Sequence, residues 1–75
     1  MSDDRVRVEI AFDGGQIISA LIESHSIERL EHALASGEER TLALDASDGR
    51  YTVVIDEIVY VKRFAREARV GFGNP

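Results

Sequence analysis

Apolar and polar residues alternate strictly from Arg5 to Phe12. The apolar positions are Val6, Val8, Ile10 and Phe12. A period of two predicts a β-strand with one buried face. Asp13, Gly14 and Gly15 follow directly, and glycine supplies the backbone conformations that tight hairpin turns need. We therefore expect the chain to reverse direction here.

The returning segment, Gln16–Glu23, is apolar on both faces. Ile18, Ala20 and Ile22 share one face, and Ile17 and Leu21 share the other. A strand of this kind needs partners on both sides. We expect either a central position in the sheet or a second face covered by another subunit.

Helical spacing replaces alternation after residue 23. The apolar residues at that spacing are Ile27, Leu30, Ala33 and Leu34. Ser24 or Ser26 is a candidate N-cap, Glu28 is expected near the positive end of the helix dipole, and Gly37 is placed to end the helix in a left-handed cap. The pattern predicts one helix of about three turns.

Strand patterns return in the second half of the chain. They predict strands over 40–45, 50–55 and 58–64, with a turn at 47–49 and a bend at Asp56 and Glu57. Residues 65–75 fit a strand, a helical turn or a tail. The predicted fold is α+β in the order β-β-α-β-β-β, mostly antiparallel, with one helix packed on a curled sheet. We expect a single domain over 1–75 whose ends, 1–4 and 73–75, fray.

Composition narrows the classes of protein. With 75 residues, 44% of them hydrophobic, the chain has the size and apolar content of one globular domain. The absence of cysteine excludes disulfides and thiolate metal sites. The acidic start, Met1–Asp4, differs from a secretory signal, and no apolar run is long enough to cross a bilayer. We expect a cytoplasmic protein that spans no membrane and holds no cofactor.

Three groups of polar residues could be interpreted as a metal site or a catalytic site, but the residues favour ordinary structural roles. His25, Glu28 and His32 are spaced to share a helix face and hold a metal, but an ordinary solvated face is the stronger interpretation. The run Ser24–Ser26 places a histidine between two hydroxyls without the third group that nucleophilic catalysis needs. Asp56 and Glu57 are expected to be exposed at a turn. We predict no catalytic or metal residue.

The strongest candidate is a basic and aromatic cluster near the carboxyl terminus. The net charge is −5, yet residues 58–75 hold four cations against one carboxylate. The predicted partner-binding residues are Lys62, Arg63, Arg66, Arg69 and Phe72, with Tyr60 and Phe64 interleaved. Cations and rings together suit single-stranded nucleic acid. In the competing interpretation, Tyr60 and Phe64 belong to the core, and the arginines pair with an acidic partner or with the rest of the domain.

Several segments resemble a family of short actinobacterial proteins known only as a domain of unknown function, or a sister group of that family. The matching segments are Val8–Ile10, Ala33–Leu34, Leu42–Leu44, Asp48–Arg50, Ile58–Val61 and, most specifically, Arg69–Gly73. The glycines at 14 and 15 depart from the family pattern, as does the lack of a proline near Asp56. The resemblance implies a cytoplasmic domain and supplies no activity or site residue.

The sequence therefore predicts a non-enzymatic interaction domain, expected to form a homo-oligomer and to present its basic and aromatic carboxyl-terminal edge to a protein partner. The alternative is a small RNA or single-stranded DNA binder using the same cluster, which the net charge of −5 disfavours. An enzyme ranks third, because so small a domain has little room for an enclosed pocket. The process, the partner's identity and the oligomer number do not follow from the sequence.

Overall fold

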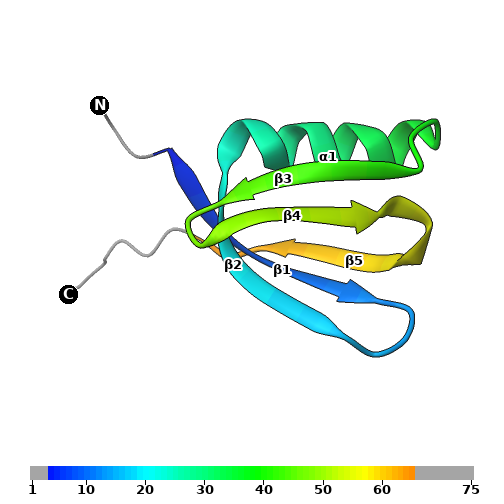
Figure 1. Ribbon diagram of the computed structural model, residues 1–75, viewed down its shortest axis with the longest axis horizontal. Coiled ribbons are helices and arrows are strands. Elements are labelled where there is room, and N and C mark those ends of the chain that lie inside the picture. Colours follow the sequence, from blue (N-terminus) through cyan, green and yellow to red (C-terminus); the bar gives the residue numbers. More distant parts are fainter. Residues whose placement is uncertain (1–3, 66–75) are drawn as a thin grey trace.

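A computed structural model describes residues 4–65, which form one α-helix, one short 3-10 turn and five strands (Figure 1). In chain order the elements are β1 (Arg5–Phe12), β2 (Ile17–Glu23), α1 (Ser24–Ser36), β3 (Thr41–Ala46), β4 (Gly49–Val54), η1 (Ile55–Glu57) and β5 (Ile58–Arg63). The α+β class and the order β-β-α-β-β-β are confirmed. Each predicted strand boundary agrees with the observed one to within one residue.

All neighbouring strands are antiparallel, in the order β4-β3-β2-β1-β5. β2 is thus the central strand, as one of the two interpretations of its apolar faces required. Its pairing is uneven: β2 follows β1 along its whole length but pairs with β3 only at Ile22 and Ala46. From that point the β1–β2 and β3–β4 hairpins diverge (Figure 1). β4 and β5 are the two edges of a sheet that does not close.

The core lies between the helix and one face of the sheet. Ile27, Leu30 and Ala33 of α1 are buried against inward-facing residues of the strands and of η1. Those residues are Val8, Ile10, Ile22, Leu42, Leu44, Val53 and Ile55. Because successive strand residues point to opposite faces, this core fixes which residues face away from the helix.

The predicted serine cap of the helix is wrong. Glu23 occupies the N-cap position and makes no capping side-chain bond, and Ser24 is already helical. The Ser24 N–H instead donates to the Asp4 carbonyl at 2.8 Å, and the Ser24 hydroxyl donates to the Asp4 carboxylate at 2.8 Å. The residue before β1 thus supplies the acceptors that a cap would have supplied. Asp4, expected to fray, is held here; residues 1–3 and 73–75 lie outside the described residues.

Because the helix begins at Ser24, Glu28 lies beyond its first turn and not, as expected, near the positive end of the helix dipole. The first turn itself contains no acidic residue. The other end is as predicted: Gly37 has φ 71° and its N–H donates to the Ala33 carbonyl. A side chain at this φ would be strained, so glycine suits the position.

Both predicted hairpin turns and the bend are confirmed. Of the two adjacent glycines at 14 and 15, only Gly15 needs a positive φ, 93°. The second turn precedes β4, and η1 makes the bend through Asp56 and Glu57. Within residues 4–65, no helix has the length and apolar character to cross a membrane.

Candidate interaction surface

The face of the sheet opposite the helix carries the candidate site, and three rows of cross-strand neighbours build it. Ile17, Ala11 and Tyr60 form the first row, Ser19, Glu9 and Lys62 the second. Leu21 and Arg7 form the third with Phe64, whose N–H donates to the Arg7 carbonyl. We call these nine residues of β1, β2 and β5, including Phe64 directly after β5, the open face.

Apolar side chains on the open face are exposed to an unusual degree. Ile17 is 56% exposed, Leu21 45% and Tyr60 44%. Ala11, between Ile17 and Tyr60, is buried. The central position of β2 therefore buries only one of its faces among the described residues. Contiguous exposed apolar side chains are a common feature of surfaces that bind other molecules.

Tyr60 is fixed on the open face by a carboxylate. Its hydroxyl donates to Glu9 Oε2 at 2.5 Å. This hydrogen bond, then desolvation, then the negative charge of Glu9 raise the pKa of Tyr60 above its ordinary value of 10.0. The interpretation of Tyr60 as a core residue is wrong, because its strand parity places it opposite the helix.

Phe64 is half-buried and lies under two cations. The Arg7 guanidinium carbon lies 5.2 Å from the ring centroid, and Lys62 Nζ lies 4.6 Å from it. Both distances are within the range of cation–π attraction. Arg7 and Glu9 were missed in the sequence because neither belongs to a motif. Strict alternation in β1 had placed them on its polar face, and only the pairing with β5 brings them to the cluster.

The structure separates the predicted basic cluster. Lys62 belongs to the open face, whereas Arg63 points to the helix side and donates two hydrogen bonds of 2.9 Å to the Glu31 carboxylate. The hydrogen bond to Glu31 raises the pKa of Arg63. Pairing with the rest of the domain is therefore confirmed for Arg63. The other predicted binding residues, Arg66, Arg69 and Phe72, lie outside the described residues.

Charges on this side of the sheet largely cancel. Arg5 is the cross-strand neighbour of Glu23, and Glu9 is the neighbour of Lys62. These pairings leave Arg7, between Leu21 and Phe64, as an additional positive charge. In a protein with a net charge of −5, this side of the sheet therefore has three cations against two carboxylates among these residues.

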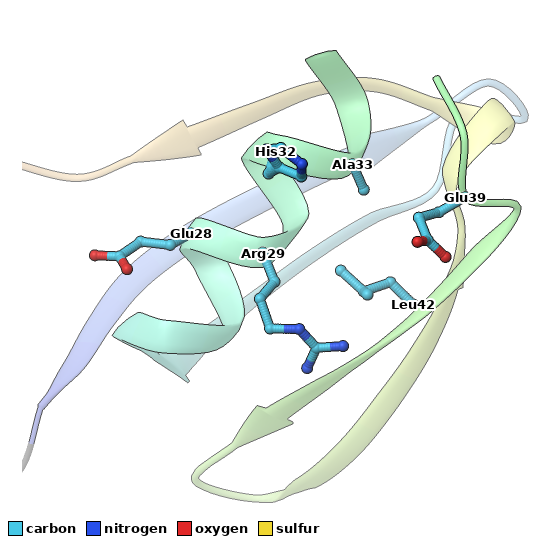
Figure 2. A pocket seen from close by; sticks show the side chains of 6 residues that line it. All are labelled: Glu28, Arg29, His32, Ala33, Glu39 and Leu42. Carbon is cyan, nitrogen blue, oxygen red and sulfur yellow. The ribbon is translucent and has the colours of Figure 1, made fainter. Parts of the chain in front are cut away.

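A groove of about 270 Å³ lies between α1 and the start of β3, on the side of the helix that carries His32 (Figure 2). Its lining residues are Glu28, Arg29, His32, Ala33, Glu39 and Leu42. Arg29 extends from α1 and Leu42 from β3 into the space between them, while the Glu28 carboxylate points away from the other five side chains (Figure 2). His25, Glu28 and His32 do not form a metal-binding group, and residues 4–65 contain no such cluster.

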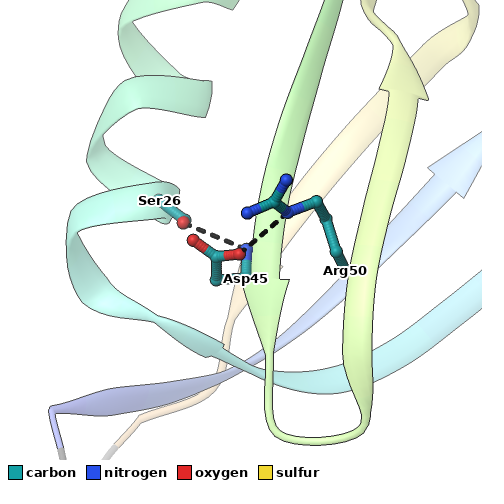
Figure 3. A network of polar contacts seen from close by, with 3 residues as sticks. All are labelled: Ser26, Asp45 and Arg50. Atoms are coloured by element: carbon teal, nitrogen blue, oxygen red, sulfur yellow. Dashed lines mark hydrogen bonds and ion pairs between the residues drawn. The ribbon is translucent and has the colours of Figure 1, made fainter.

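Ser26, a candidate N-cap in the sequence, links two elements of the fold. Ser26 is 1% exposed, and its hydroxyl oxygen accepts a hydrogen bond of 3.1 Å from the Asp45 N–H (Figure 3). The Asp45 carboxylate in turn accepts a hydrogen bond of 3.2 Å from Arg50 Nε. The serine thereby joins α1 to β3 close to the single β2–β3 pair. Asp56 and Glu57 are both exposed in η1.

A second groove, of about 360 Å³, lies between the β1–β2 hairpin and β4. Its apolar lining comes from Phe12, Ile18, Tyr51, Val53 and Val54. Sequence reasoning missed this groove, because alternation assigns Phe12 and Ile18 to the buried face without showing that the two hairpins diverge.

No family model, no curated protein and no solved structure matches the chain.

Proposed function

We propose that this protein is a non-enzymatic, self-associating interaction domain that presents the open face to a protein partner. The observation that carries the proposal is the uncovered second face of the central strand, with Ile17 and Leu21 about half exposed beside Tyr60. Burying these side chains would supply the hydrophobic contribution to binding. The cancelling charges around them allow another acidic protein to approach.

The non-enzymatic part of the proposal is supported by the location of the polar groups. The two grooves described above lie at the surface, and the one of about 360 Å³ is lined mainly by apolar side chains. The hydroxyl of Ser26 is buried and engaged by the Asp45 N–H. We also propose a cytoplasmic location and kinship with the actinobacterial family that the sequence resembles.

The experiment is an affinity capture from native lysate, divided into nuclease-treated and untreated halves, with wild-type protein and two variants. Leu21→Glu places a charge on the open face, and Leu34→Glu makes the same change at an exposed leucine of α1. We expect a defined protein that survives nuclease, is lost with Leu21→Glu and is retained with Leu34→Glu. Equal capture by both variants would exclude the open face as the site.

Single-stranded RNA or DNA is the second candidate. Tyr60 and Phe64 on an exposed sheet beside Arg7 and Lys62 are the observation that favours it. The Glu9 carboxylate in the middle of the open face opposes phosphate binding, and Arg63 is bound to Glu31 on the other side. This candidate requires that capture collapses with nuclease and that affinity falls steeply with added salt.

A further inference from the structure

The β5 strand is an exposed edge with a high tendency to form β-structure. Its sequence, Ile58–Arg63, contains three β-branched residues and a tyrosine, and Val59 is 63% exposed. In the described sheet only β1 pairs with β5. An apolar edge strand of this kind is a template for pairing with another strand.

The backbone groups that are available on this edge can be identified. The Phe64 N–H donates to the Arg7 carbonyl. Because hydrogen-bonded residues alternate along an antiparallel ladder, the backbone N–H and C=O groups of Lys62 and Tyr60 also point toward β1. The N–H and C=O groups of Val61 and Arg63 therefore point outward, away from β1. They define the register in which an added strand can pair.

We propose that a second copy of the chain pairs along this edge, β5 with β5, antiparallel and centred on Val61. This inference rests on the proposed self-association and deepens it. In this register Val61 exchanges hydrogen bonds with Val61 of the second copy, and Arg63 lies opposite Val59.

Charge complementarity favours this register. Lys62 of one copy lies opposite Tyr60 of the other, whose hydroxyl is bonded to Glu9. Each ammonium group therefore approaches a tyrosine ring and a carboxylate, and by symmetry this happens twice. A register shifted by one residue on each copy would place the two Tyr60 side chains opposite each other and remove Lys62 from this contact.

The area of the open face gives a second reason for the β5–β5 pairing. Three strands about 4.8 Å apart, each about 17 Å long over the residues of the open face, give this face a projected area of roughly 240 Å². A standard interface needs about 800 Å² per partner. A twofold axis perpendicular to the sheet places the open faces of both copies on the same side of the joined sheet. Because each open face ends at its own β5 and the two β5 strands are paired, the two faces form one continuous surface of roughly twice the area.

Sedimentation of the full chain at graded concentrations tests the pairing. We expect wild-type protein to be a dimer at high micromolar concentration and Val61→Pro to weaken the dimer by roughly tenfold or more, because proline removes the outward N–H from both copies. Val61→Thr keeps the N–H and the β-branched shape and should remain a dimer. A monomeric wild type, or equal dimerisation of folded proline and threonine variants, would overturn the proposal.

Because Val61 contacts the core and its proline variant can fail to fold, cysteine crosslinking provides the second measurement. The chain has no cysteine, so single-cysteine variants are unambiguous. Directly opposite residues have Cα atoms about 5.5 Å apart, within disulfide reach, whereas the two Lys62 positions would be roughly 8 Å apart. We expect Val61→Cys to crosslink under oxidation and Lys62→Cys to do so much less. Equal crosslinking would contradict the register.

Different results would contradict partner binding by the open face and the β5–β5 pairing. If Leu21→Glu abolishes partner capture but Val61→Cys does not crosslink, the open face stands and the β5 pairing is wrong. If Val61→Cys crosslinks but Leu21→Glu and Leu34→Glu capture alike, the dimer stands and the partner-binding role of the open face is wrong.

Discussion

Lys62 and Arg63 are adjacent in β5 but lie on opposite sides of the sheet. Lys62 Nζ lies 4.6 Å from the centroid of the Phe64 ring on the open face, and Arg63 donates two hydrogen bonds to Glu31 of α1 on the helix side. Two residues that read as one basic cluster in the sequence therefore contribute to different properties. One belongs to the proposed binding surface and the other connects the helix to an edge strand.

This separation predicts different effects for the two alanine substitutions. Arg63→Ala should lower the free energy of unfolding by less than about 1 kcal/mol, because the pair with Glu31 is partly exposed, and should leave partner capture unchanged. Lys62→Ala should reduce capture with little loss of stability. Urea unfolding and the affinity capture described above measure both properties. A loss of capture with Arg63→Ala alone would contradict the assignment.

The hydrogen bond between Ser26 and Asp45 predicts a stability difference between two neighbouring serines. Ser26→Ala should cost about 1–2 kcal/mol of unfolding free energy, because it leaves the Asp45 N–H without its acceptor in a partly buried place. Ser24→Ala is the matched control, since the Ser24 hydroxyl donates to the Asp4 carboxylate in an exposed place. Urea unfolding of both variants is the measurement, and equal losses would contradict the structural role of Ser26.

The left-handed cap of α1 predicts that Gly37→Ala lowers the free energy of unfolding by about 1 kcal/mol, because alanine is strained at φ 71°. Gly14→Ala offers the comparison. Gly14 does not have a positive φ, and an added Cβ there would meet only the Gln16 side-chain oxygen at an ordinary 3.8 Å. Thermal unfolding should show a lower midpoint for the first variant and little change for the second. The reverse order would refute the argument.

The tyrosine contacts predict an alkaline transition. Hydrogen bonds to Glu9 and Asp48 raise the pKa of Tyr60 and of Tyr51, respectively, above 10.0. Each bond stabilises the folded state while the phenol is neutral, so its contribution is complete below pH 10 and is lost as the pH rises through the raised pKa. The chain has two tyrosines, so Tyr51→Phe leaves Tyr60 as the only one.

Tyrosinate absorbance during a pH titration of Tyr51→Phe is the corresponding measurement. Ionisation of Tyr60 should occur above its ordinary pKa, and adding Glu9→Gln should lower that pKa by removing both the ionised acceptor and its negative charge. A titration at the ordinary value in Tyr51→Phe, unchanged by Glu9→Gln, would show that the contact is not maintained in solution.

The sequence alone determined the elements of this fold. Period-two alternation identified β1, helical spacing identified α1, and Gly37 and the Asp48–Gly49 turn identified element ends, because each of these signals depends on residues only a few positions apart. It also showed that β2 has two apolar faces. Local pattern failed at the helix start, where the acceptor for Ser24 comes from Asp4, twenty residues earlier in the chain.

Only the tertiary structure decided which residues meet. The pairing of β1 with both β2 and β5 brings Leu21, Arg7 and Phe64 into one row, and the irregularity in the β1–β5 register near Ala11 and Phe12 sets the facing of the last strand. Sequence adjacency had grouped Lys62 with Arg63, whereas the pleat places them on opposite faces. Cross-strand register is fixed by core packing between distant segments, so the open face could not be derived from neighbouring residues.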